Sequence, residues 1–270
     1  APVTPQNHQL SIYEEYDGVE VIRDFFSQYG VIVLDYDKTD HSDYDAIAKF
    51  IGDRYDFIVK FYNELRQSIS NKCEKRTLDL FFSSSESLTD TVNLGKKLDE
   101  YQFFDKFDYY KAPIKRIDFK HTNNSEKINF INGGWLETYI SLKLSETLDS
   151  IKEKSGIDFQ YTILKNLKLK MNGGRGAEFD LFFEVNQKVF WIEAKSHNLD
   201  ENSLRKCFTK YDDYSKLLGL GEERAFVVHT NPQNSYINWG ANGYPYIKTL
   251  SHKDFHKTIS DIIKKDLQIK

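Results

Sequence analysis

The chain has 270 residues, 40% of them hydrophobic and 15% aromatic, which is enough to bury one large core or two smaller ones. Its formal net charge of −4 argues against a protein that coats nucleic acid without specificity. Its two cysteines, Cys73 and Cys207, lack CxxC spacing, so neither a disulfide framework nor a zinc knuckle is expected.

The first 125 residues predict a mixed region in which helices predominate. Three helices are predicted, at 19–29, 43–70 and 86–102, and in 43–70 apolar residues recur at helical spacing. Short apolar runs predict two strands, a buried one at 30–36 and another at 77–82. A polar, turn-rich segment at 121–127 then predicts a domain boundary near residue 125. The role of residues 1–125 stays open between dimerisation, substrate choice and regulation.

Residues 126–270 predict an α/β core in the order helix, three antiparallel strands, helix, strand. The first helix includes the segment GGWLETY (133–139) and ends at Gly156. The later elements are strands at 157–170, 177–185 and 188–196, a helix at 201–218, a strand at 224–230 and a last helix at 252–265.

Two stretches of the chain are locally basic, although the whole chain is acidic. Their cations could follow the phosphates of nucleic acid, and ordinary solvated lysine faces are the alternative. The first stretch contains Lys111, Lys115, Arg116 and Lys120, and the second contains Lys165, Lys168, Lys170 and Arg175.

The predicted hairpin at 177–196 brings several charged side chains together. With Asn186 and Gln187 as its two loop residues, the register puts Asp180 opposite Glu193. The same register puts Glu178 opposite Lys195. Residues two apart on a strand share a face, so these four side chains are expected to project together.

Two opposed carboxylates about 5 Å apart repel each other and destabilise a sheet. A hard divalent cation bound between them turns that repulsion into ligation. A neighbouring lysine can orient or deprotonate a metal-bound water and offset charge on a phosphate. The alternative interpretation is a half-exposed hairpin with a charged outer face, because an ExK tripeptide alone occurs by chance in most proteins of this size.

The segments EFD (178–180) and EAK (193–195), with twelve residues between them, resemble the D…(D/E)xK signature of the PD-(D/E)XK nucleases. Together with GGWLE (133–137), they look most like the nuclease domains of CRISPR-associated ancillary effectors, which usually carry a CARF domain that senses ring nucleotides. The resemblance covers about residues 126–230 and implies a restriction-endonuclease-like fold. The first 125 residues lack the strand–helix alternation of a CARF domain, which puts cyclic-nucleotide activation in doubt.

This resemblance implies a divalent-metal-dependent endonuclease that uses Mg²⁺ or Mn²⁺. Asp180 and Glu193 would be direct metal ligands, and the backbone carbonyl of Ala194 would supply another. Glu137 would reach the metal directly or through water, or help to hold a second ion. Lys195 would position the attacking water and stabilise the phosphorane-like state.

The expected partner is nucleic acid, DNA in preference to RNA, and the expected setting is phage defence or a mobile element. An enzyme that cuts both strands of a duplex needs two sites, so a homodimer is expected. No stretch has the roughly 18 uninterrupted apolar residues of a membrane helix. The first residues do not form a signal peptide. We therefore expect a cytoplasmic protein without a membrane partner.

Two other functions compete with the nuclease. The segment 31–40 (VIVLDYDKTD) matches the nucleophile loop of haloacid-dehalogenase-like phosphatases, in which Asp35 would attack phosphorus and Asp37 would act as acid and base. Against it, no later strand ends in the paired acids that would complete that site, and a buried strand that runs into an acidic loop is the alternative. The second competitor is a nuclease-like protein that binds nucleic acid without cutting it.

Several further residues have weaker signals. Lys206 and Tyr211 are candidate phosphate contacts, with an exposed helix face as the alternative, and a salt bridge to Lys195 is the alternative role of Glu178. Trp135 is expected in the core. His197 and His229 lack partners at metal-ligand spacing. Four loop aromatics could stack on bases, although a packed loop is favoured: Tyr236, Trp239, Tyr244 and Tyr246.

Overall fold

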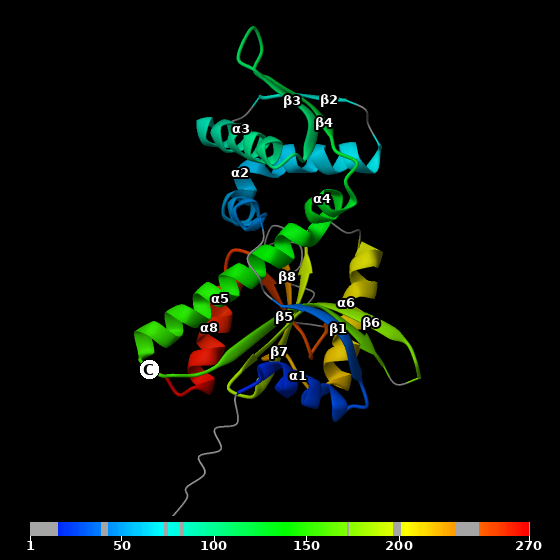
Figure 1. Ribbon diagram of the computed structural model, residues 1–270, viewed down its shortest axis with the longest axis vertical. Helices are drawn as coiled ribbons and strands as arrows, with labels where there is room; N and C mark the ends of the chain where they lie inside the picture. The colour runs from blue at the N-terminus through cyan, green and yellow to red at the C-terminus, as the bar shows by residue number, and fades with distance from the viewer. Residues whose placement is uncertain are drawn as a thin grey trace, which may run out of the picture.

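The computed structural model describes residues 16–38, 43–72, 75–81, 84–171, 173–196, 201–230 and 243–269. The molecule is elongated and has two parts that follow one another along its long axis (Figure 1). The larger part is built around a six-stranded sheet and the smaller part around a three-stranded sheet.

The six-stranded sheet has the order β1-β5-β6-β7-β8-β9. Neighbouring strands are antiparallel from β1 to β7, whereas β7, β8 and β9 run parallel. The strands are β1 (Ile32–Lys38), β5 (Tyr161–Lys170), β6 (Gly176–Val185), β7 (Lys188–Lys195), β8 (Ala225–His229) and β9 (Lys248–Ser251). The predicted order of three antiparallel strands, helix and strand is confirmed, and β9 was not predicted.

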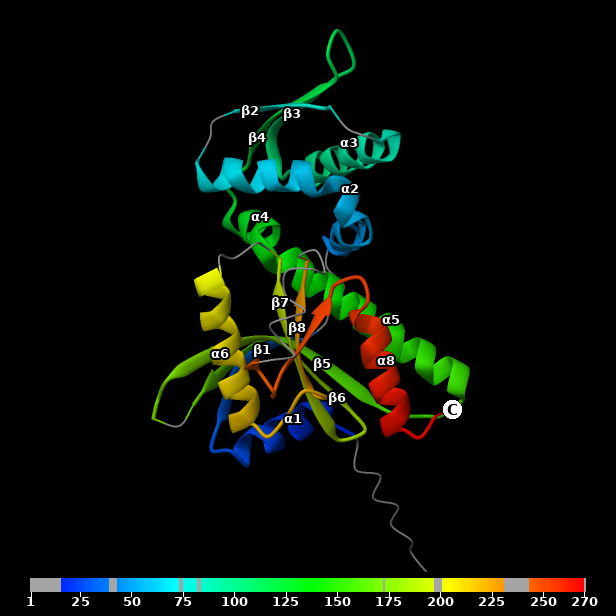
Figure 2. The same ribbon diagram turned by 180° about the vertical axis from the view of Figure 1, so that it is seen from behind.

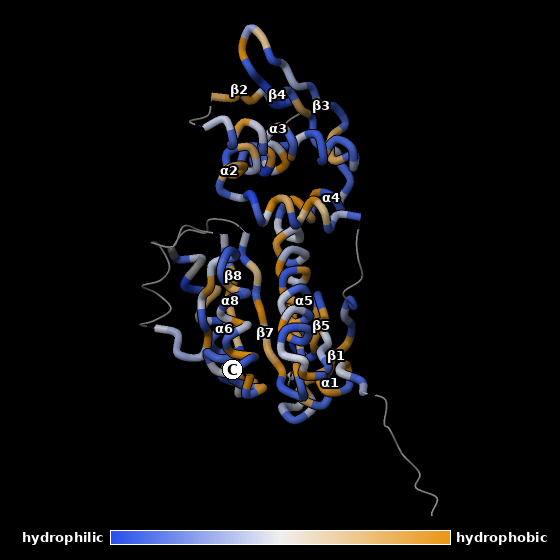
Figure 3. The backbone as a smooth tube through the Cα atoms, turned by 90° about the vertical axis from the view of Figure 1, so that its left-hand side faces the viewer, coloured by the Kyte–Doolittle hydropathy of each residue, from blue (hydrophilic) through white to orange (hydrophobic). Residues whose placement is uncertain are grey.

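Helices cover both faces of this sheet. The helices α5 (Trp135–Ser155) and α8 (Phe255–Asp266) pack on one face, and α1 (Gly18–Ser27) and α6 (Glu201–Leu217) pack on the other. The central strand β7 is therefore apolar on both faces and runs as a hydrophobic stretch through the larger part (Figure 3).

The smaller part consists of two helices, a β-hairpin and a third strand beside it (Figure 2). Its sheet has the order β2-β4-β3 and is antiparallel throughout. The elements are α2 (Asp45–Ser70), β2 (Arg76–Asp79), α3 (Ser85–Glu100), β3 (Phe104–Tyr110) and β4 (Arg116–His121). The basic stretch that contains Lys111 and Lys115 is thus part of a β-hairpin, which projects at one end of the molecule (Figures 1 and 2).

A short α4 (Ser125–Asn129) and a single π-helical turn, η1 (Phe130–Gly134), lead from the smaller part into α5. Here the two parts share one core. Trp135 is fully buried, as predicted, and stacks on Tyr55 of α2 with ring centroids 5.6 Å apart. Its indole N–H donates to the Tyr62 hydroxyl at 2.8 Å, and that hydroxyl donates to the carbonyl of Ile131 at 2.7 Å.

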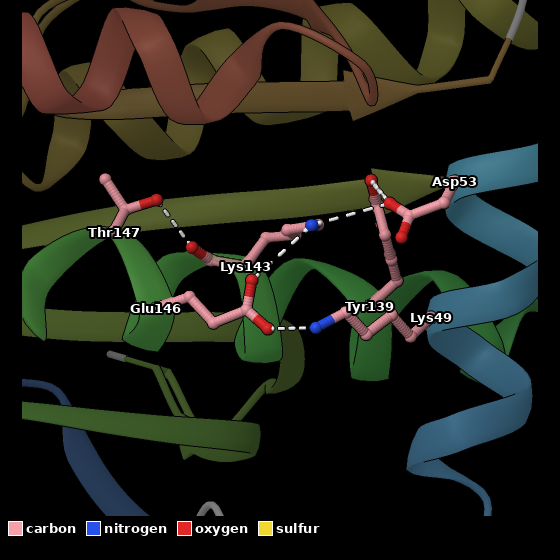
Figure 4. A network of polar contacts seen from close by, with 6 residues as sticks. All are labelled: Lys49, Asp53, Tyr139, Lys143, Glu146 and Thr147. Carbon is pink, nitrogen blue, oxygen red and sulfur yellow. Dashed lines mark hydrogen bonds and ion pairs between the residues drawn. The ribbon is translucent and has the colours of Figure 1, made fainter. Parts of the chain in front are cut away.

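A polar network continues the contact between α2 and α5 on the outside of this core (Figure 4). The Tyr139 hydroxyl donates to Asp53 Oδ1 at 3.0 Å, and Lys143 Nζ lies 3.4 Å from the same oxygen. Gly52 of α2 permits the close approach, because a Cβ at this position would lie 2.3 Å from Tyr139 Cδ2. Apolar and polar contacts together fix the smaller part against the start of α5.

Two expectations about the first 125 residues need correction. The boundary near residue 125 does not separate the two sheets, because α1 and β1 pack in the larger part. The strand predicted as buried at 30–36 is an exposed edge strand, with Ile32 58% and Leu34 62% exposed. It pairs with β5 on one side only, so apolar residues on it stay in contact with solvent.

No helix formed by the described residues is both long enough and apolar enough to cross a membrane.

Candidate functional site

The hairpin formed by β6 and β7 has the predicted register. Val185 pairs with Lys188 and Leu181 pairs with Ile192. The two loop residues, Asn186 and Gln187, have φ values of 50° and 67°. Positive φ at both central positions is the conformation of a type I′ turn, whose twist matches that of the flanking strands.

The regular pairing stops at Asp180. Its carboxylate Oδ2 accepts a hydrogen bond from the backbone N–H of Ala194 at 2.7 Å. On the other side of β6, the ladder with β5 omits Asp180 and Asn166, and Asn166 has φ 52°. Asparagine tolerates this left-handed conformation better than most residues do. The strand therefore has an irregularity at Asp180 that points its carboxylate towards β7.

This irregularity corrects the expected position of Glu178. Leu181 packs in the core under α5, whereas Phe179, two residues earlier, packs in the core on the other face. The rule that residues two apart share a face thus fails across Asp180. Glu178 is exposed and pairs with Lys168 of β5, and among the described residues no ion pair joins it to Lys195.

Asp180, Glu193 and Lys195 converge at the end of the hairpin. The Lys195 Nζ lies 3.0 Å from Glu193 Oε1 and 3.7 Å from Asp180 Oδ2. Glu193 is only 4% exposed, and its second oxygen, Oε2, is buried without a hydrogen-bond partner. A buried carboxylate oxygen without a partner carries a desolvation cost that a cation would remove.

Glu137 lies in the first turn of α5. It is half-buried, and among the described residues it makes no ion pair. Burial raises the pKa of its carboxyl group, and the charges of Lys195 and Glu193 also act on that pKa. Glu137 is thus within electrostatic reach of the cluster.

The cluster carries more negative than positive charge in a place with little water. Burial raises the pKa of Asp180 well above its ordinary value, and the charge of Glu193 raises it further. Burial would lower the pKa of Lys195, but Glu193 and Asp180 outweigh this and raise it. The lysine is therefore held as an ammonium between two carboxylates.

Metal-binding geometry is incomplete in this arrangement. Among the described residues, no group of three or more His, Cys, Asp or Glu side chains is placed to hold a metal ion. Asp180 and Glu193 both contact Lys195, whereas Glu137 makes no ion pair with it in the part of the chain that the structure describes. Ala194 was expected to offer its backbone carbonyl to the metal. It pairs with Val228 of β8, and its N–H donates a hydrogen bond to Asp180. The chemistry of the donors, carboxylate oxygens, is nevertheless that of a site for a hard cation.

Tyr211 on α6 completes the cluster in a way that sequence reasoning missed. It is 5% exposed, and Lys195 Nζ lies 5.3 Å from the centroid of its ring. Burial raises the pKa of its phenol, and the neighbouring Glu193 raises it further. The helical spacing of Phe208, Tyr211 and Ser215, all buried, could have identified this inward face. Lys206 lies on the exposed face of α6, as the alternative interpretation expected, whereas Tyr211 lies on its buried face.

Three of the remaining candidate residues, His229, Tyr244 and Tyr246, are packed in the structure. His229 is buried at the end of β8. Tyr244 packs on Phe208, with ring centroids 5.6 Å apart, and the Tyr246 N–H donates to Asp212 Oδ1 at 2.7 Å. These two aromatics therefore belong to a packed loop. His197, Tyr236 and Trp239 lie outside the described residues.

The phosphatase motif does not form a site. Asp35 makes an ion pair with Lys168 at 2.9 Å, and Asp37 accepts a hydrogen bond from Asn166 Nδ2 at 2.7 Å. Both lie on the exposed edge strand β1, which is antiparallel to β5. A nucleophile on such a strand lacks the enclosed, water-poor surroundings that its reaction needs. Thr39 lies outside the described residues.

No family model matches the chain, and no curated protein matches it in sequence. Solved structures do match its fold. One is Can2 from Sulfobacillus thermosulfidooxidans, solved in complex with cyclic tetra-adenylate, at 16% identity and a TM-score of 0.57. Another is the protein VC1899 from Vibrio cholerae, at 18% identity and a TM-score of 0.51. In each case the match covers 90% of this chain but only 60% of the other chain, so this chain shares its mixed α/β fold with part of these larger proteins.

Proposed function

We propose that the chain is a divalent-metal-dependent nuclease that hydrolyses phosphodiester bonds of DNA, related to the ancillary effectors of CRISPR-associated phage defence. The observation that carries the proposal is the convergence of Asp180, Glu193 and Lys195 in a poorly hydrated place at the end of one hairpin. Two carboxylates close to one another, one of them buried, weaken a fold, so their presence favours a chemical role.

The comparison with Can2 supports the same proposal. Can2 binds a cyclic oligonucleotide in its solved structure, and this chain matches part of it in fold. The motifs GGWLE, EFD and EAK add a likeness in sequence to the nuclease domains of such effectors. Binding of cyclic tetra-adenylate is not part of the proposal, because the match leaves 40% of Can2 uncovered.

In this proposal Asp180 and Glu193 hold Mg²⁺ or Mn²⁺, with Glu137 and the carbonyl of Ala194 as further ligands. Their donors fit a hard cation, and the unpartnered Oε2 of Glu193 is an unused one. When bound, the ion supplies Lewis-acid activation of the phosphate and a water of lowered pKa.

Lys195 is the residue that faces the phosphate in this proposal. Its raised pKa keeps it protonated, so it acts as a cation and hydrogen-bond donor and not as a general base. Its ammonium offsets the charge that develops on the phosphate oxygens. Tyr211 positions Lys195 by covering it from the side of α6.

Cleavage assays with four variants test the proposal. We expect Glu193→Gln, Asp180→Asn and Lys195→Ala each to lower Mg²⁺- or Mn²⁺-dependent cleavage of DNA by about a hundredfold or more. Glu178→Gln is the matched control, because Glu178 lies on the same hairpin but outside the cluster. Full cleavage by Glu193→Gln would refute the proposal.

The competing function, a nuclease-like protein that binds DNA without cutting it, is favoured by one observation. Lys195 lies between the two carboxylates, and the described residues include no group of three metal-ligating side chains placed to hold an ion. A protein with only the binding function would still bind DNA but would show no metal-dependent cleavage of it. The same assay therefore distinguishes the two functions. The predicted homodimer is measured separately, by sedimentation of the chain with and without a DNA duplex.

A further inference from the structure

The hairpin of β3 and β4 extends from the smaller part at one end of the molecule (Figure 1). Every residue from 110 to 116 is exposed. The carbonyl of Lys115 accepts a hydrogen bond from the N–H of Leu80 at 2.8 Å, so the end of β2 lies beside the tip. A strand pair that projects in this way is free to contact a large partner.

The tip of this hairpin is positively charged, whereas its base is neutralised. At the base, Lys106 pairs with Asp108 and Lys120 with Asp105, each at 3.3 Å. Among the described residues, Lys111 and Lys115 at the tip make no ion pair.

Arg116 adds a third positive charge beside these two lysines. Its guanidinium lies 4.6 Å from the ring centroid of Tyr110, and its Nε lies 3.6 Å from Asp118 Oδ1. The segment from Tyr109 to Ile117 contains no acidic residue. Asp118 offsets the charge of Arg116, so the uncompensated positive charge at the tip is that of Lys111 and Lys115.

Apolar side chains accompany these cations. Ile114 is 47% exposed at the tip, and Phe81 at the end of β2 is 71% exposed. A surface that only needed solubility would not place them among lysines. Cations that contact phosphates, together with apolar groups that contact sugars and bases, are the combination used to hold nucleic acid.

We propose that the β3–β4 hairpin is a DNA-binding element that contacts duplex DNA outside the catalytic cluster, with Lys111 and Lys115 on phosphates and Ile114 in a groove. The proposal rests on the proposed function for its choice of DNA among polyanions. A two-stranded ribbon fits the major groove of B-form DNA but not the deep, narrow major groove of duplex RNA. Duplex DNA is therefore the expected partner.

Binding of a fluorescent 20-base-pair DNA to the whole chain, followed by anisotropy in EDTA, tests the proposal. We expect the double variant Lys111→Gln/Lys115→Gln to bind about tenfold more weakly, with a salt dependence reduced by about two phosphate contacts. Ile114→Ser should weaken binding without changing the salt dependence. The wild-type chain should prefer this duplex to RNA of the same sequence.

The matched control is Lys154→Gln/Lys264→Gln. It removes the same charge from the last turns of α5 and α8, which lie at the far end of the molecule from the hairpin (Figure 1). We expect it to change the affinity less than twofold. The proposal is overturned if the hairpin variant binds like the wild type, if the control weakens binding equally, or if duplex RNA binds as well as DNA.

A small diester separates this proposal from the catalytic one. Bis(p-nitrophenyl) phosphate is too short to reach the hairpin from the cluster. If the chain hydrolyses it with Mn²⁺, the hairpin variant should do so at the wild-type rate, and a loss of that rate would count against a role in binding alone. If Glu193→Gln leaves this hydrolysis unchanged, the proposed function fails, while the anisotropy result still decides the hairpin.

Discussion

Glu184 lies in β6 with no solvent exposure, and two hydrogen bonds hold its carboxyl group. The Tyr16 hydroxyl donates to Oε2, and the backbone N–H of Gln187 donates to Oε1. Burial raises the pKa of Glu184 to about 7, although the hydrogen bond from Gln187 lowers it in part. Replacement by Gln keeps the shape and removes the titration.

The size and sign of the effect follow from this pKa. The ordinary value is 4.5 and the folded value about 7. Since a difference of one in pKa corresponds to about 1.4 kcal/mol, ionisation of Glu184 costs the folded state up to about 3 kcal/mol. The folded chain holds the proton more tightly than the unfolded chain. The stability that Glu184 contributes is therefore fully present below pH 4.5 and is lost as the pH rises through 7.

Urea unfolding of the wild type and of Glu184→Gln between pH 4.5 and pH 8.5 measures this effect. The free energy of unfolding of the variant, relative to that of the wild type, should rise by about 2–3 kcal/mol across that range. The titration of all other groups is common to both proteins and cancels in the difference. Glu178→Gln, at an exposed position on the same strand, is the matched control for the loss of one carboxylate. A pH-independent difference for Glu184→Gln would show that the carboxyl group is not buried as described.

Three other substitutions test the packing around the cluster. Tyr62→Phe leaves a buried indole N–H and a buried carbonyl without their partner, so it should lower the free energy of unfolding by about 2–4 kcal/mol, measured by urea titration. Gly52→Ala should cost about 1–3 kcal/mol by thermal unfolding, since its Cβ would meet Tyr139 and the gain in helix propensity is smaller. Tyr211→Phe should lower kcat for DNA cleavage about tenfold with little change in KM, because the hydroxyl acts on Lys195 and not on the substrate.

Local patterns were sufficient to predict much of the larger part. The two-residue loop at Asn186 and Gln187 allowed one register for β6 and β7, and that register is observed between Val185–Lys188 and Leu181–Ile192. The pairs predicted beyond it, Asp180 with Glu193 and Glu178 with Lys195, are not in the ladder. The α5 helix could also be predicted from the sequence, because its apolar stripe runs unbroken to the left-handed C-cap at Gly156. In both cases a short-range rule decides the structure without help from the rest of the fold.

What could not be predicted depends on contacts between distant segments. The position of Glu178 follows from the irregularity at Asp180, which needs both the Ala194 N–H and the left-handed Asn166. The strand β1 is apolar enough to be a core strand and lies at an edge only because no further strand pairs with it. Sequence periodicity contains neither kind of information.

The candidate chemistry and the smaller part are mechanically linked. Glu137 lies two residues after Trp135, and Trp135 is held by Tyr55 and Tyr62 of α2. Asp180, by contrast, is held within the sheet by Ala194. The place of Glu137 therefore depends on how α2 packs against the start of α5, whereas the place of Asp180 depends on the hairpin itself.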